Sequence, residues 1–191
     1  MTRAGTRLDE GKIRQRLAPS DWRHCLRTAA VATVLAERFG ADVERARLAG
    51  LLHDYARSIP RGEMVAAAEE LGIEVDDIQR QFPYLLHAEI GAKLAGEELG
   101  IIDAEVLAAI ANHTVGRPRM SDLEKIIYLA DMLEPERRFE EIDEVRALAE
   151  HDLDAAFHRG YALSLEHLVA SGKLIHPRTV AVWNWINSKD R

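Results

Sequence analysis

The chain has 191 residues, 47% of them hydrophobic, and a formal net charge of −7. This length and composition are enough for one domain with a substantial core. The acidic total argues against a general nucleic-acid binder, which would show a basic face. A single cysteine, Cys25, excludes an intramolecular disulfide and a cysteine-rich zinc site. No stretch is apolar and long enough to span a membrane, and residues 1–7 lack the apolar core of a signal peptide. We therefore expect a cytoplasmic protein without a membrane or nucleic-acid partner.

The whole chain is expected to be helical, because Ala, Leu, Glu and Arg dominate and alternating β-branched runs are absent. Ser20, Asp42 and the capping box Ser121–Glu124 mark helix starts, and glycines and prolines mark helix ends. The pattern predicts helices over 9–17, 20–39, 42–59, 63–71, 75–81, 84–99, 103–113, 121–133, 141–150 and 153–170, and a last one from near Pro177. Neither a repeat nor a dividing linker is present.

His53 and Asp54 stand side by side in the apolar run 51–56. Burying a carboxylate is costly unless it is paired or bound to a metal, so this doublet indicates a functional site. A single histidine on an apolar helix is more often a hydrogen-bonded core residue than a ligand. Here, however, four further groups also lie in apolar helical patterns: His24, His87, His113 and Asp131. The six together predict one buried metal site lined by nitrogen and oxygen.

Histidine nitrogens and carboxylates suit Fe, Mn, Co or Zn, and no soft sulfur ligand selects among them. His24, His53, Asp54 and Asp131 make one octahedral site with positions open to water. Two roles remain open for His87 and His113. They can hold a second ion with Asp54 as the bridge, or they can act as cationic donors to a phosphate.

Arginines follow these groups along the chain. Arg57 lies one turn beyond the His-Asp pair and Arg137 lies just past Asp131, where each could hold a phosphate through two oxygens. Arg61, Arg119 and Arg138 are interpreted as solvated surface charge. Metal ligands combined with phosphate-binding arginines indicate hydrolysis of a phosphoester or phosphoanhydride.

The order of these residues resembles the HD-domain metal-dependent phosphohydrolases, and most closely their YqeK family. The resemblance runs from about Leu17 to Asn187, and its motifs are Leu51–Arg57, His87-Ala88 followed by Gly91, His113–Pro118, Glu124–Asp131 and Glu134–Arg137. Members of that family are symmetrical diadenosine tetraphosphate hydrolases that use iron and release two ADP. The resemblance thus implies a bis(5'-nucleosyl)-tetraphosphatase whose partner is a dinucleoside polyphosphate or an ADP-like nucleotide.

The resemblance also implies a fold and a set of site residues. The expected fold is an all-α HD-domain helical bundle forming one domain over 1–191, with the metal-site core at about 20–140 and C-terminal helices at about 141–188 packing on it and closing the pocket. One or two iron ions are expected, with Mn, Co or Zn as alternatives. The implied metal ligands are His24, His53, Asp54 and Asp131. The implied nucleotide site comprises Asp54, Arg57, His87, His113, Arg137 and the loop Ile175, His176, Pro177, Arg178 and Thr179, with catalytic roles for Asp54, His87 and His113.

The chain departs from the family pattern at two places. Asp21 stands where an arginine is usual, which affects one phosphate contact, and Glu140-Glu141 replaces Pro-Gly in a surface turn. Other polar and aromatic residues are assigned no site role: His151, His158 and His167 match no ligand position, Cys25 is expected to turn away from the neighbouring ligand His24, and Trp183 and Trp185 are expected to pack.

Two alternatives to this function remain. One is another HD reaction, such as nucleotide phosphomonoesterase or cyclic-dinucleotide phosphodiesterase activity. The other is a sensor that binds nucleotide without turnover. The sequence leaves the metal, the base preference and a possible homodimer open.

Overall fold

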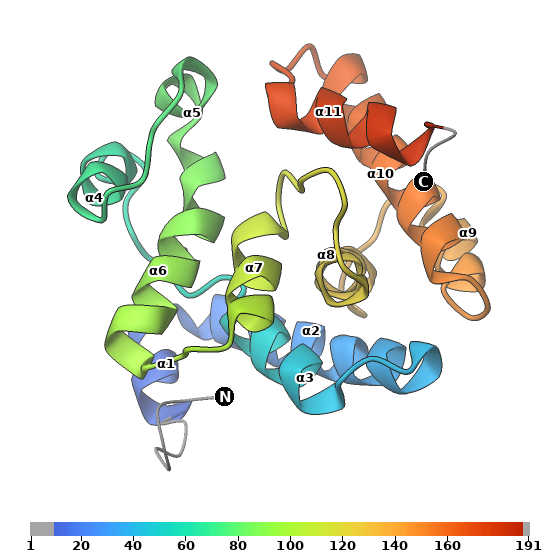
Figure 1. Ribbon diagram of the computed structural model, residues 1–191, viewed down its shortest axis with the longest axis horizontal. Coiled ribbons are helices and arrows are strands. Elements are labelled where there is room, and N and C mark those ends of the chain that lie inside the picture. The colour runs from blue at the N-terminus through green and yellow to red at the C-terminus, as the bar shows by residue number, and fades with distance from the viewer. Residues whose placement is uncertain (1–9, 189–191) are drawn as a thin grey trace.

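The structure is a computed structural model that describes residues 10–188. Within that range the regular elements are helices, which confirms the all-α expectation (Figure 1). Their bounds are α1 Glu10–Arg16, α2 Pro19–Phe39, α3 Val43–Leu52, α4 Met64–Glu70, α5 Asp77–Gln81, η1 Pro83–Leu86 (a 3-10 helix), α6 His87–Leu99, α7 Ala104–Asn112, α8 Asp122–Leu133, α9 Ile142–Leu148, α10 Leu153–Ala170 and α11 Pro177–Ile186.

Several helix starts are capped as the sequence predicts. The Asp42 side chain accepts a hydrogen bond from the Arg45 amide at the start of α3. The Asp103 side chain accepts from the amides of Glu105 and Val106 in the first turn of α7. Ser121 and Glu124 form the expected capping box of α8. The prediction that Ser20 caps the next helix is wrong, because α2 already begins at Pro19, whose fixed φ suits the first helical position. The expected start at Asp9 lies outside the described residues.

The helix predicted over 84–99 is divided in two. Pro83–Leu86 form a 3-10 turn and the α-helix begins only at His87. The Nδ1 atom of His87 lies 2.5 Å from the carbonyl oxygen of Tyr84, so the tighter turn also fixes the direction of the histidine ring.

The long helix α2 packs against α3 and α8, while α7 contacts α3, α6 and α8, and the four helices α2, α3, α7 and α8 form the central group of the fold. Figure 1 shows α4, α5 and α6 on one side of this central group and α9, α10 and α11 on the other. The C-terminal helices attach through α10, which packs on α8, and α11 packs on α10. No helix in the range 10–188 combines the length and apolarity that crossing a membrane requires.

A glycine allows α2 and α3 to approach closely. A Cβ atom added at Gly50 would lie 2.8 Å from the Cα of Ala29, a contact too short for any other residue type. His24 lies five residues before Ala29 on α2, and His53 lies three residues after Gly50. This close approach therefore brings the two histidines toward one another.

Candidate metal centre

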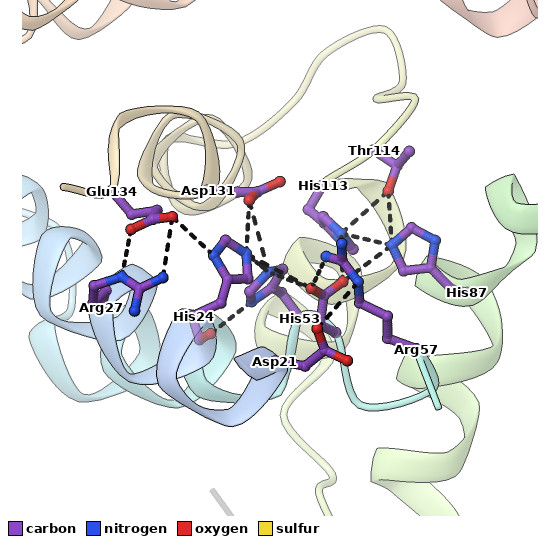
Figure 2. Close-up of polar contacts among 12 residues, drawn as sticks. Asp21, His24, Arg27, His53, Arg57, His87, His113, Thr114, Asp131 and Glu134 are labelled. Carbon is purple, nitrogen blue, oxygen red and sulfur yellow. Dashed lines mark hydrogen bonds and ion pairs between the residues drawn. The ribbon is translucent and has the colours of Figure 1, made fainter. Parts of the chain in front are cut away.

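Six polar side chains from five segments converge at the centre of the molecule. His24 comes from α2, and His53 and Asp54 follow α3. His87 begins α6, His113 directly follows α7, and Asp131 comes from α8. Figure 2 shows the histidine rings in a row, with Asp131 above the first pair. Five of the six are buried, and the side chain of Asp131 is 26% exposed. The sequence prediction that the six meet is therefore confirmed, while their roles as ligands remain a prediction.

The helix predicted over 42–59 is too long, because α3 ends at Leu52 and residues 53–58 form consecutive turns. Three amides in this stretch donate to the carbonyl three residues earlier: Tyr55 to Leu52, Arg57 to Asp54 and Ile59 to Ala56. His53 and Asp54 thus both face the centre, with Nε2 of the histidine 3.4 Å from Oδ2 of the aspartate. A regular helix would have turned neighbouring side chains about 100° apart.

The first cluster contains His24, His53 and Asp131. Nε2 of His24 lies 2.9 Å from Oδ1 of Asp131 and 3.2 Å from Nε2 of His53. Oδ2 of Asp54 lies 3.7 Å from the same His24 nitrogen. Two nitrogens and two carboxylate oxygens therefore point at one small volume.

The second cluster contains Asp54, His87 and His113. Nε2 of His87 lies 3.1 Å from Nε2 of His113, and the other oxygen of Asp54, Oδ1, lies 3.3 Å from His87 and 3.8 Å from His113. The hydroxyl of Thr114 lies 3.1 Å from Nε2 of His113. Because its two oxygens face different clusters, Asp54 has the geometry of a bridging carboxylate.

Charges within the centre are strongly coupled. Burial would lower the pKa of His53, but Asp54 and Cys25 together outweigh it and the pKa lies well above its usual value. Burial would likewise raise the pKa of Asp54 and of Asp131, but the surrounding histidines hold both far below their usual range. Burial, together with His53 and His87, lowers the pKa of His113 to about 3. Near neutral pH, both carboxylates are therefore ionised and His113 is a neutral base.

These residues fit divalent metal ions. Within each cluster the candidate ligand atoms lie within 4.8 Å of one another. Nitrogen atoms of two histidines face each other at close to 3 Å in both clusters, an arrangement that needs either a shared proton or a cation between them. Four imidazoles and two carboxylates form a borderline donor set that suits first-row transition metals.

Two arginines border the centre, as the sequence predicts. An Nη atom of Arg57 lies 2.5 Å from Oδ2 of Asp54, and one of Arg137 lies 2.7 Å from Oδ1 of Asp131. A cavity of about 270 Å³ opens beside them, lined by Ser20, Asp21, Arg23, His24, Arg27, Arg57, Glu134, Glu136 and Arg137. Asp21 lies 3.8 Å from the Nε atom of Arg57. The lining thus combines four arginines with three carboxylates and His24, and its guanidinium groups are the donors suited to phosphates.

The segment 175–179 lies apart from this cavity. His176 caps α11 and its Nε2 atom lies 2.7 Å from Oδ2 of Asp76, while Arg178 pairs with Glu89 at 2.7 Å. The Thr179 carbonyl accepts from the hydroxyl of Tyr161 at 3.4 Å. Within the described chain, these polar contacts run to α5, α6 and α10 rather than to the histidine clusters, so a role of this segment in binding substrate stays a prediction.

Sequence reasoning missed a buried carboxylate at the end of α8. Glu134 pairs with Arg27 at 2.6 Å, and its other oxygen lies 3.3 Å from Nδ1 of His24. Burial would raise the pKa of Glu134, but Arg27 and the surrounding donors lower it. The motif Glu134–Arg137 includes this residue, but the sequence does not show that its carboxylate is buried against His24.

Cys25 nevertheless lies next to the centre, because its sulfur lies within 4.8 Å of candidate ligand atoms of His53 and Asp54. His151, His158 and His167 lie outside both clusters, as expected. His158 packs near Trp183, with ring centroids 5.4 Å apart.

An all-helical bundle with paired histidines and a bridging carboxylate beside an arginine-lined cavity defines the metal-dependent phosphohydrolase class. The HD-domain family model matches residues 21–136 of this chain, and the chain belongs to that family. The matched range contains all six residues of the centre and the bordering Arg57, and it ends one residue before Arg137.

The chain is also similar to named members over almost its full length. It is 39% identical over 92% of its length, and 94% of the relative, to the symmetrical bis(5'-nucleosyl)-tetraphosphatase of Bacillus subtilis (strain 168). It is 38% identical over 90% of its length, and 91% of the relative, to the enzyme of the same name from Halalkalibacterium halodurans. A crystal structure of a predicted HD superfamily hydrolase involved in NAD metabolism, from Clostridium acetobutylicum, superposes with a TM-score of 0.90 at 36% identity, covering 95% of this chain and 98% of that one.

Proposed function

We propose that this protein is a metal-dependent hydrolase that cleaves diadenosine tetraphosphate symmetrically into two ADP. The observation behind the proposal is the two-cluster centre bridged by Asp54. It occurs in a chain that matches two symmetrical bis(5'-nucleosyl)-tetraphosphatases over at least 90% of its length. Identity spread over both whole chains supports a shared substrate as well as a shared fold.

His24, His53, Asp131 and Asp54 would hold one metal ion, and Asp54, His87 and His113 a second. Divalent ions in such a site supply Lewis acidity and make water a competent nucleophile near neutral pH. We expect iron, with Mn, Co and Zn as the other metals that this donor set accepts. If only one ion binds, His87 and His113 act instead as donors to the substrate phosphates.

The protein contributes charge neutralisation and position. The four phosphates of the substrate are polyanionic, and Arg57 and Arg137 lie beside the ligand carboxylates, where guanidinium groups can bind phosphate oxygens in pairs. In the reaction, water oxygen bonds to one of the two central phosphorus atoms and the central bridging oxygen leaves with the other ADP. Because ADP is a good leaving group, stabilising the developing charge matters more than protonating it.

Symmetrical cleavage requires the protein to direct attack to one of the two central phosphorus atoms rather than to one of the two outer ones. The arginine-lined cavity beside the centre can hold one nucleoside diphosphate half, which places the central anhydride at the clusters. The 175–179 segment is a further candidate for contacts with the nucleoside.

Product analysis tests the proposal. The protein, reconstituted with Fe²⁺ under anaerobic conditions, is incubated with diadenosine tetraphosphate and the nucleotides are separated by chromatography. ADP should be the dominant product. The joint appearance of AMP and ATP would contradict symmetrical cleavage. Turnover of nucleoside monophosphates or cyclic dinucleotides without turnover of this substrate would indicate another HD reaction, and binding without any turnover would indicate a sensor.

A further inference from the structure

The four histidines of the centre differ in what their outer nitrogen contacts. In three of them Nδ1 lies within 2.5–2.8 Å of the main-chain carbonyl three residues earlier: His53 with Gly50, His87 with Tyr84, and His113 with Ile110. His24 is the exception, because its Nδ1 faces Oε1 of Glu134 at 3.3 Å. One ligand histidine is thus backed by a charged carboxylate and the other three by neutral carbonyls.

The Glu134 side chain is only 3% exposed, and its orientation is fixed from several sides. Nε of Arg27 lies 2.6 Å from Oε2, and the amide of Glu136 donates to the same oxygen at 2.9 Å. Oε1 faces Nδ1 of His24 and also accepts from Nη2 of Arg27 at 3.4 Å, as Figure 2 shows. The arrangement joins α2 to the turn after α8.

A carboxylate on the outer nitrogen of a ligand histidine fixes its tautomer and raises its basicity, and does so more strongly than a neutral carbonyl. We propose that Glu134 is a positioning residue that makes the position formed by His24, His53 and Asp131 the tighter of two metal positions. The position formed by Asp54, His87 and His113 has main-chain carbonyls alone behind its imidazoles and binds the second ion more weakly.

This inference rests on the metal-dependent function proposed above, but its test measures metal binding rather than turnover. Metal-free wild type, E134Q and E134A are titrated with Mn²⁺, with free ion followed by electron paramagnetic resonance and bound ion by elemental analysis. The wild type should show one tight and one weaker ion. E134Q keeps the size of the side chain and a neutral acceptor oxygen, so the tight dissociation constant should rise about 10-fold, and in E134A it should rise up to about 100-fold. The weaker constant should stay unchanged.

Glu124 provides a matched control, because it is also a fully buried carboxylate held by an arginine, with Arg117 Nε at 2.6 Å. Its described partners are Arg117, Asn112 and Ser121, and none of them is a ligand. E124Q should lower the unfolding midpoint and leave the dissociation constant of the tighter ion unchanged. An unchanged tight constant in E134Q would overturn the proposal, as would equal weakening of both positions or equal weakening by E124Q.

Four further outcomes are possible, and each has a stated meaning. Two equivalent ions in the wild type would overturn the asymmetry. If the wild type binds a single ion, weakening of that ion in E134Q supports the role of Glu134 and an unchanged constant refutes it. If E134A does not fold, E134Q alone decides. Mn²⁺ binding as expected without cleavage of diadenosine tetraphosphate would overturn the proposed function and leave this inference standing.

Discussion

At the scale of single residues, Asp54 has the most demanding role, since each of its oxygens faces a different histidine cluster. Replacing it by alanine should remove metal and diadenosine tetraphosphate hydrolysis together, because both positions lose a ligand. Metal content by elemental analysis and ADP release are the measurements. D143A is the control, since the Asp143 side chain is 90% exposed on α9. Full metal retention in D54A would refute the bridging role.

Arg137 should affect catalysis without affecting metal content. Losing one charge-assisted contact to phosphate costs about 1.5–3 kcal/mol, which is roughly a ten- to hundredfold loss in kcat/KM. R137A should show that loss with the same bound metal as the wild type, and R137K should recover part of it. The neighbouring R138A is the control because Arg138 is exposed. Equal losses in R137A and R138A would mean that only general surface charge matters.

Metal uptake should depend on pH through His53. Its pKa in the metal-free protein lies well above 6.5, so near neutral pH the ring holds a proton that must leave before Nε2 can bind an ion. Asp54 and Asp131 are already ionised and His113 already neutral, so they release no proton there. Affinity should therefore fall as pH falls, about tenfold per pH unit around pH 7 for one released proton. Titration calorimetry in buffers of different ionisation enthalpy measures how many protons are released per bound ion. A metal affinity that does not change with pH would contradict this account.

The convergence of the six polar residues was predictable because each interrupts an apolar helical pattern. Their division into two clusters was not, since it depends on which oxygen of Asp54 faces which ring. The role of Glu134 was equally hidden, because its partners His24 and Arg27 lie more than 100 residues away in sequence.

At the scale of elements, the turns at 53–58 and the approach of α2 to α3 position the histidines. The turns escaped prediction because residues 51–56 are all buried and their apolar pattern fits a helix as well as a tight series of turns. The helix starts at Asp42, Asp103 and Ser121 were predictable, because a capping side chain acts within three residues of its own position.

Replacing Gly50 by alanine tests the close contact between α2 and α3. In G50A the new methyl group would meet the backbone of Ala29 at 2.8 Å, which a side-chain rotation cannot relieve. Overpacking of this kind should destabilise the protein by about 1–3 kcal/mol in denaturant unfolding, and it should weaken metal binding by separating His24 from His53. A Cβ at Gly62 meets nothing within 4 Å, so G62A should unfold as the wild type does. Equal stability of the two variants would show that α2 and α3 can separate without cost.

At the scale of the whole molecule, α8 joins the parts, since it packs against α2, α3, α7, α9 and α10. The ion pairs of His176 with Asp76 and of Arg178 with Glu89 add a second link between the C-terminal helices and the opposite side. We therefore expect one cooperative unfolding transition, with calorimetric and van't Hoff enthalpies equal.

Bound metal should raise the midpoint temperature of that single unfolding transition and should not divide it into two transitions. For a single site at a free-ion concentration of 100 times its dissociation constant, the free energy of unfolding should rise by about 2.7 kcal/mol. Scanning calorimetry with and without Mn²⁺ measures it. Two separate transitions, of which only one responds to metal, would show that the C-terminal helices fold independently of the metal-site core.

The arginine-lined cavity stands in a protein whose formal charge is −7. A polyanionic substrate is therefore repelled by the molecule at a distance and attracted only near the cavity. At physiological ionic strength the screening length is about 8 Å, which suppresses the distant repulsion more than the attraction at contact. Substrate capture should consequently tolerate salt far better than that of a basic nucleic-acid binder, and long polyanions such as RNA, which would extend over the acidic surface, are disfavoured by the same field.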